Sequence, residues 1–193
     1  MKISIFGAGN TLLTDEGFGV HFVRHLQSRY NLPENVDVVD AGTMGMLASG
    51  FIENYDYVFI IDVVEVKEKP GTVLIYDYDD IRLNKMPAKL SPHQIGIQEM
   101  LLMCDMRDVS PENLKLISVV PESMEIGDKL SETLQNNLEK VENILLKELE
   151  SLDVPFYKKS TNTNLKKTTK YHSQICTKCM LMGKNTAKLK LKK

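Results

Sequence analysis

With 193 residues, 42% of them hydrophobic and 26% charged, the chain suits one globular domain with a substantial core, or one such domain followed by a tail. No apolar run approaches the roughly 20 residues that a membrane-spanning helix needs, which excludes a protein of that class. The net charge of −2 conceals a division: eleven lysines and no acidic residue lie between Lys158 and Lys193, whereas 1–157 holds 13 basic and 26 acidic residues.

The first elements in chain order alternate between strand and helix patterns. The apolar run 3–6 (ISIF) predicts a strand that ends at Gly7, and 17–30 has apolar residues near helical spacing. A second strand is predicted at 36–39, followed by a short helix at 44–53.

The later elements continue this alternation. The run 57–61 (YVFII) has no polar interruption, as expected of a central strand covered on both faces. A fourth strand is predicted at 73–76, a helix at 91–107 with Ser91 as N-cap and Pro92 at its first position, and a fifth strand at 116–120. Leucine and valine recur every three or four residues from 130 to 149, which predicts a final amphipathic helix. The whole pattern is typical of an α/β domain with a mainly parallel sheet.

Polar residues occur where the predicted strands end. Glu16 follows the first strand, Asp40 ends the second and Asp62 ends the central one, while His93 lies in the first turn of a later helix. Ligand sites of parallel sheets lie beyond the carboxyl ends of the strands, so we expect these side chains to share one edge. Simpler roles stay open: Glu16 as a complement to a helix dipole, and Asp40 as part of a turn.

Two carboxylates and one imidazole (Glu16, Asp62 and His93) would leave coordination positions open, which suits a divalent ion such as nickel or zinc. The sequence lacks the His-Glu-x-x-His and Gly-x-Ser-x-Gly motifs, which argues against a zincin peptidase and a serine hydrolase. Gly7-Ala8-Gly9 suggests a dinucleotide loop, but Leu12 stands where the fingerprint needs its third glycine.

Four ordered motifs resemble one known family. Residues 7–21 (GAGNTLLTDEGFGVH) are similar to the opening signature of the hydrogenase maturation endopeptidases, 40–45 (DAGTMG) to their second motif and 57–62 to their third. The segment 91–96 (SPHQIG) resembles the histidine motif of the branch that serves uptake-type nickel–iron hydrogenases. The resemblance runs from Met1 to about Leu149. Two departures concern Ala41, where the family often has glycine, and Val120, where it often has glutamine.

The resemblance implies a three-layer α/β sandwich, with a twisted, mostly parallel five-stranded sheet and helices on both faces. It implies an endopeptidase that removes the C-terminal extension of the hydrogenase large-subunit precursor after nickel insertion. Glu16, Asp62 and His93 match the family's nickel-contacting positions, and the nickel is expected to be carried by the precursor. Asp40 and Asp62 are the candidate catalytic residues, with Asp40 as a supporting acid or base. We expect a monomer.

Two other functions stay open at this stage. A non-catalytic nickel metallochaperone for the same precursor would explain the ligands without any bond cleavage. An α/β hydrolase or phosphorylase-like enzyme acting on a small molecule would instead bind a nucleoside or phosphate.

Three cysteines are too few for a disulfide framework, and the start MKISIFGAG lacks the long apolar region of a secretory signal peptide, so we expect a cytoplasmic protein. The domain is expected to span 1–157, and the basic tail 158–193 to be disordered. In the tail, His172, Cys176 and Cys179 offer three metal ligands, one fewer than a closed zinc site needs. A charge run is usually solvated, so we expect neither a nucleic acid nor a membrane as partner.

Overall fold

The computed structural model describes residues 1–83 and 92–159 of the chain. Its centre is a five-stranded sheet in which four neighbouring strands are parallel and the last edge strand is antiparallel. Across the sheet, the strands are β3 (Val36–Gly42), β1 (Ile3–Ala8), β4 (Tyr57–Val63), β6 (Asn113–Val119) and β5 (Val73–Asp77). The uninterrupted apolar run YVFII lies in β4, the middle strand, as predicted.

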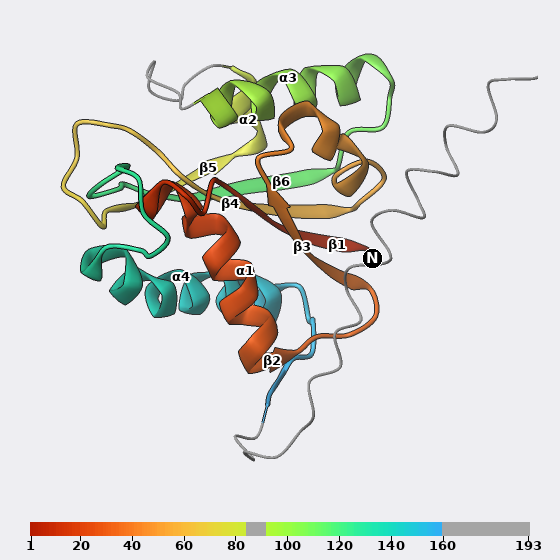
Figure 1. The fold of residues 1–193 in the computed structure, drawn as a ribbon. Helices are drawn as coiled ribbons and strands as arrows, with labels where there is room; N and C mark the ends of the chain where they lie inside the picture. The colour runs from red at the N-terminus through yellow and green to blue at the C-terminus, as the bar shows by residue number, and fades with distance from the viewer. Residues whose placement is uncertain (84–91, 160–193) are drawn as a thin grey trace, which may run out of the picture. The chain divides into compact units, whose positions relative to one another are not determined.

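Helices cover both faces of this sheet (Figure 1). One face carries α1 (Phe18–Arg29) and α4 (Glu132–Ser151), and the other carries η2 (Gly45–Phe51), α2 (Tyr78–Arg82) and α3 (Pro92–Met106). A short 3-10 helix, η1 (Thr14–Gly17), connects β1 to α1. The three-layer α/β class predicted from the sequence is therefore confirmed.

The sheet has one apolar core on each face, because successive side chains of a strand point to opposite faces. In β4, Phe59 and Ile61 pack toward α1 and α4, whereas Val58 and Ile60 pack toward η2, α2 and α3. The alternation matters for the strand ends, since it decides which layer each polar residue faces.

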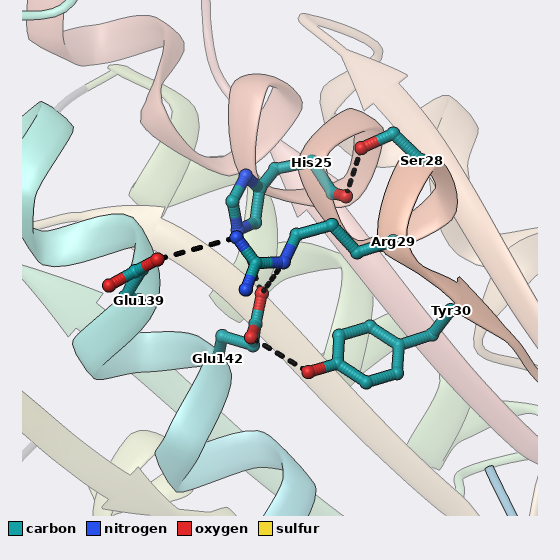
Figure 2. A network of polar contacts seen from close by, with 6 residues as sticks. All are labelled: His25, Ser28, Arg29, Tyr30, Glu139 and Glu142. Carbon is teal, nitrogen blue, oxygen red and sulfur yellow. Dashed lines mark hydrogen bonds and ion pairs between the residues drawn. The ribbon is translucent and has the colours of Figure 1, made fainter. Parts of the chain in front are cut away.

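A buried ionic network holds α4 against α1. Glu142 on α4 is 4% exposed, and its carboxylate lies 2.7 Å from His25 Nε2 and 3.1 Å from Arg29 Nε. The Tyr30 hydroxyl donates to the same carboxylate at 2.9 Å. Figure 2 shows His25, Arg29 and Tyr30 meeting the Glu142 carboxylate of α4, with Glu139 at the exposed edge of the network.

The folded unit extends slightly past its predicted boundary. Tyr157 and Lys158 form β7, which pairs antiparallel with β2 (Tyr30–Asn31), and the compact unit ends at Lys159. Lys158, assigned to the tail from sequence, therefore belongs to a strand pair. The predicted disorder and the possible metal ligands His172, Cys176 and Cys179 lie outside the described residues and stay predictions.

Most predicted elements are present, and several differ in type or bounds. The helix predicted at 44–53 is a 3-10 helix, β3 continues three residues past its predicted end, and β6 begins three residues before its predicted start. The helix α2 and the β2–β7 pair were not predicted. The proposed cap Ser91 lies outside the described residues, although α3 does begin at Pro92. Within 1–83 and 92–159, no helix combines the length and apolar character that crossing a membrane requires.

Candidate functional site

At the carboxyl edge of the sheet, the segment that follows β1 packs so closely on the strand ends that two of its glycines, Gly9 and Gly19, have no space for a side chain. Gly9 has φ +134°, and a Cβ placed on it would lie 1.9 Å from the Glu16 carbonyl oxygen. A Cβ on Gly19 would lie 2.2 Å from the Ile61 carbonyl oxygen. These close approaches explain the glycines of the first motif: they let η1 and the start of α1 lie directly on the ends of β1 and β4.

The structure brings Glu16 and Asp62 together at this edge. Glu16 lies in η1 and is 3% exposed, and Asp62 near the end of β4 is fully buried. Burial raises the pKa of Asp62 from 3.8 to about 7; a hydrogen bond from the Val63 N–H opposes this rise, and the charge of Glu16 adds to it. Two acidic side chains in a dry environment favour a cation between them, or a proton on one of them.

Asp62 keeps one oxygen unused. Its Oδ1 accepts from the Val63 N–H at 2.8 Å, whereas the buried Oδ2 has no hydrogen-bond partner among the described residues. Since a buried carboxylate oxygen ordinarily has a partner, this orphan is the clearest sign of a ligand position in the fold.

His93 lies in the first turn of α3, as predicted. In Figure 1, α3 runs opposite to β1 and β4, so its N-terminal end lies toward the edge at which those strands end. By strand alternation Asp62 faces the same layer as α3. The His93 side chain is outside the described part of the chain, so its position as a third ligand stays a prediction.

Asp40 is at the same edge but faces the other layer. It is paired in register with Gly7 of β1, and Arg24 on α1 donates two hydrogen bonds to its Oδ2, at 3.0 Å from Nε and 2.8 Å from Nη2. The Gly42 N–H donates to Oδ1 at 3.2 Å. The sequence predicted the shared edge correctly and missed the arginine, which has no sequence signal beyond its place on α1.

His21 is a further polar group at this edge that sequence reasoning did not select. Its Nε2 is buried and has no hydrogen-bond partner within the described ranges. The pKa of His21 is lowered, first by burial and then by the charge of Arg24, whereas Asp40 and Asp128 act to raise it. The charges of Arg24, Asp40 and Asp128 therefore all act on His21.

Asp15, next to Glu16, fixes the surrounding loops. It is fully buried, and its carboxylate accepts hydrogen bonds from the backbone N–H groups of Glu122, Ser123 and Ser131 at 2.7–3.0 Å. These partners are more than 100 residues away in sequence, so no local pattern pointed to them. We call this arrangement the Asp15 clasp; it anchors η1, and with it Glu16, to the segment that follows β6.

Within the described ranges, no group of three His, Cys, Asp or Glu side chains is placed to hold a metal ion. Glu16 and Asp62 supply two acidic groups, and His93 is the predicted third, whose side chain is not among those described. The metal-binding role of these three residues therefore stays a prediction.

Comparison with known proteins decides the class of the chain. A sequence model of a family described as hydrogenase maturation protease matches residues 20–148. The chain belongs to this family. The Hydrogenase 2 maturation protease of Escherichia coli is 39% identical to this maturation protease over 144 residues, which cover 72% of this chain and 85% of the relative. The HupD hydrogenase expression/formation protein of Rhizobium leguminosarum is 35% identical over 64% of this chain and 61% of its own length.

Solved structures agree. The hydrogenase maturating endopeptidase HybD of E. coli superposes on this maturation protease with a TM-score of 0.78 and 34% identity, covering 84% of this chain and all of HybD. A hydrogenase 2 maturation peptidase from a thaumarchaeote gives a TM-score of 0.58 at 28% identity, covering 77% of this chain and 98% of the other. The chain is thus an endopeptidase of the maturation family, and the metallochaperone and small-molecule-enzyme alternatives lose their support.

Proposed function

We propose that this endopeptidase removes the C-terminal extension of the nickel–iron hydrogenase large-subunit precursor after nickel has been inserted. The names of its relatives support hydrogenase maturation as the process. The orphan Oδ2 of Asp62, buried beside Glu16, carries the proposal, because it offers a carboxylate oxygen to a metal that arrives with the substrate.

In this proposal Glu16, Asp62 and His93 contact the nickel of the precursor, so nickel acts as part of the substrate. Contact would fix the precursor's C-terminal segment at the sheet edge and make cleavage conditional on metal loading. A precursor without nickel would lack the group that these side chains contact and would bind poorly.

The peptide bond would then be hydrolysed by water. Asp62 is one candidate to accept a proton from that water, and Asp40 is a supporting acid or base. The hydrogen bonds from Arg24 and Gly42 orient Asp40, which is half-buried and accessible from the same edge.

The test measures cleavage of nickel-loaded and of nickel-free precursor by three enzymes: wild type, His93→Ala and Glu112→Gln. Glu112 directly precedes β6, at the end of the strand away from the candidate site, and serves as the control position. Mass spectrometry should show that wild type and the control shorten only the loaded precursor. His93→Ala should slow cleavage by about 100-fold or more, the usual scale for a misplaced substrate. Equal cleavage of loaded and nickel-free precursor by wild type would refute the metal-reading role.

A further inference from the structure

Two exposed apolar side chains lie on neighbouring loops that are fastened to η1. The side chain of Leu12 is 67% exposed. That of Ile126 is 92% exposed, which is the highest value among the large apolar residues of the described ranges. They belong to two loops, 9–13 after β1 and 120–130 after β6, which join at this point. We call these two side chains the Leu12–Ile126 tip.

The tip is held rigidly although it faces solvent. The Gly127 N–H donates to the Leu12 carbonyl at 3.0 Å, and the Thr14 N–H donates to the Gly127 carbonyl at 2.9 Å. The Asp15 clasp fixes the start of the second loop through Glu122 and Ser123. Because the backbone of these loops is already fastened, a partner that covers the two side chains need not order the loops themselves.

The tip is continuous with the candidate site. Thr14 begins η1, the element that carries Glu16, and its N–H donates to the Gly127 carbonyl at 2.9 Å while its Oγ1 donates to the Ser123 carbonyl at 2.7 Å. A polypeptide that contacts the tip therefore lies beside η1, the element that carries Glu16.

The rim of the tip is acidic. Glu122, Glu125 and Asp128 are all exposed in the loop of Ile126, with Lys129 as the one exposed basic residue there. Such a rim favours a partner with positive charge around an apolar contact.

We propose that the Leu12–Ile126 tip is the docking surface for the protein substrate, and that it binds an apolar segment of the precursor flanked by basic side chains. This inference rests on the proposed function, because the precursor is its occupant. The tip would add affinity remote from the scissile bond, so it would govern KM and leave the chemical step at the sheet edge unchanged.

The first test replaces both apolar side chains, Leu12→Ser with Ile126→Ser, and compares them with Leu102→Ser with Met106→Ser on α3. The control residues are also exposed, at 60% and 79%, and lie beyond the first turn of α3. For nickel-loaded precursor, the tip variant should raise KM at least about ten-fold, equivalent to ~1.4 kcal/mol of binding, with kcat within about two-fold of wild type. An unchanged KM, or an equal rise in the control, would overturn the proposal.

The second test concerns the acidic rim. Glu125→Lys should lower kcat/KM about three-fold or more at low salt, and the difference from wild type should shrink at high salt. Glu112→Lys, which reverses one charge at the far end of β6, should have little effect. If the two charge reversals lowered kcat/KM equally, the effect would come from the net charge of the enzyme, and the assignment of a basic partner segment would be overturned.

Binding separates this inference from the proposed function. Precursor binding to immobilised enzyme can be measured independently of cleavage. If wild type binds the precursor through the tip without shortening it, the proposed function fails and the docking surface stands. If wild type shortens the precursor and the tip variant does so with wild-type KM, the docking surface fails alone.

Discussion

At the residue scale, Asp62 is the most unusual group in the domain. A fully buried carboxylate whose pKa is raised to about 7 destabilises the native state once it is ionised. A packing role at this position would be better served by an apolar residue of similar size, because burying a carboxylate without a partner for both oxygens costs free energy. Packing alone therefore gives no physical reason for an aspartate at this position.

Asp62→Asn should change how stability depends on pH. Between about pH 4 and 7 the native wild type keeps a proton that the unfolded chain has released, so its stability should fall as pH rises through this window. The variant cannot titrate there. The free energy of unfolding of the metal-free proteins can be measured with denaturant at pH 5 and pH 8. From pH 5 to pH 8, the value for the variant should rise relative to that for wild type by about 1–3 kcal/mol. A difference independent of pH would contradict the raised pKa.

Gly9→Ala tests the close approach of the first loop to Glu16. A methyl group on Gly9 would collide with the Glu16 carbonyl oxygen and would force its positive φ onto alanine, so η1 must shift. We expect precursor cleavage to fall by about 100-fold. Gly50→Ala is the matched control, since a Cβ there meets nothing within 4 Å among the described residues. A Gly9→Ala enzyme with wild-type kcat/KM would show that this contact does not position Glu16.

The candidate site could be predicted only in part. The shared edge of Glu16, Asp40 and Asp62 follows from strand ends in a parallel sheet, and the structure has that arrangement. The partners could not be predicted, because Arg24 meets Asp40 through tertiary packing and the amides on Asp15 come from residues 107 to 116 positions later. Periodicity identifies which face a residue occupies, and it contains no information on which distant group meets it.

At the element scale, the Glu142 network decides how α4 seats on α1. One buried carboxylate satisfies His25, Arg29 and Tyr30, and burial together with Glu142 raises the pKa of the Tyr30 hydroxyl. Removing Glu142 would leave the Arg29 charge partly buried without its main partner.

Glu142→Ala should therefore lower the free energy of unfolding by about 3 kcal/mol. Glu139→Ala, which removes a carboxylate 70% exposed at the rim of the same network, should change it by less than about 0.5 kcal/mol. Chemical denaturation of both variants at neutral pH provides the measurement. Comparable losses would mean that the network does not anchor the helix.

Elements with a strong period were predictable, and short ones were not. The leucine spacing of α4 and the apolar run of β4 were sufficient to predict these two elements from the sequence. By contrast, α2 is five residues long and depends on the capping box of Asp77 and Asp80, and β2 and β7 have two residues each. Segments this short have no period, and their form is decided by what they pack against.

At the scale of the whole molecule, the compact unit 1–159 contains both apolar cores and every described site residue. Its last pairing, between β2 and β7, includes Lys158. The boundary for a functional truncation is thus Lys159, two residues beyond the sequence-based boundary.

A chain of residues 1–159 should fold with the thermal stability of the full chain and cleave nickel-loaded precursor with kcat/KM within about two-fold of it. Differential scanning calorimetry and the cleavage assay measure the two quantities. A large loss of kcat/KM with unchanged stability would assign the basic segment a role in substrate capture. Truncation after Phe156, which removes β7, serves as the comparison for the strand pair.

The Asp15 clasp also determines when the site can form during synthesis. The strands β1, β3 and β4 are complete once residue 63 has been made, but the clasp needs the Ser131 amide. At roughly 5–20 residues per second, the 68 residues between those points take on the order of 3–14 seconds to translate. Until Ser131 has been made, the Asp15 carboxylate lacks its full set of amide donors, and the anchor of the Glu16 loop is incomplete. The residues of most of the parallel sheet are therefore synthesised well before the anchor of the Glu16 loop can be completed.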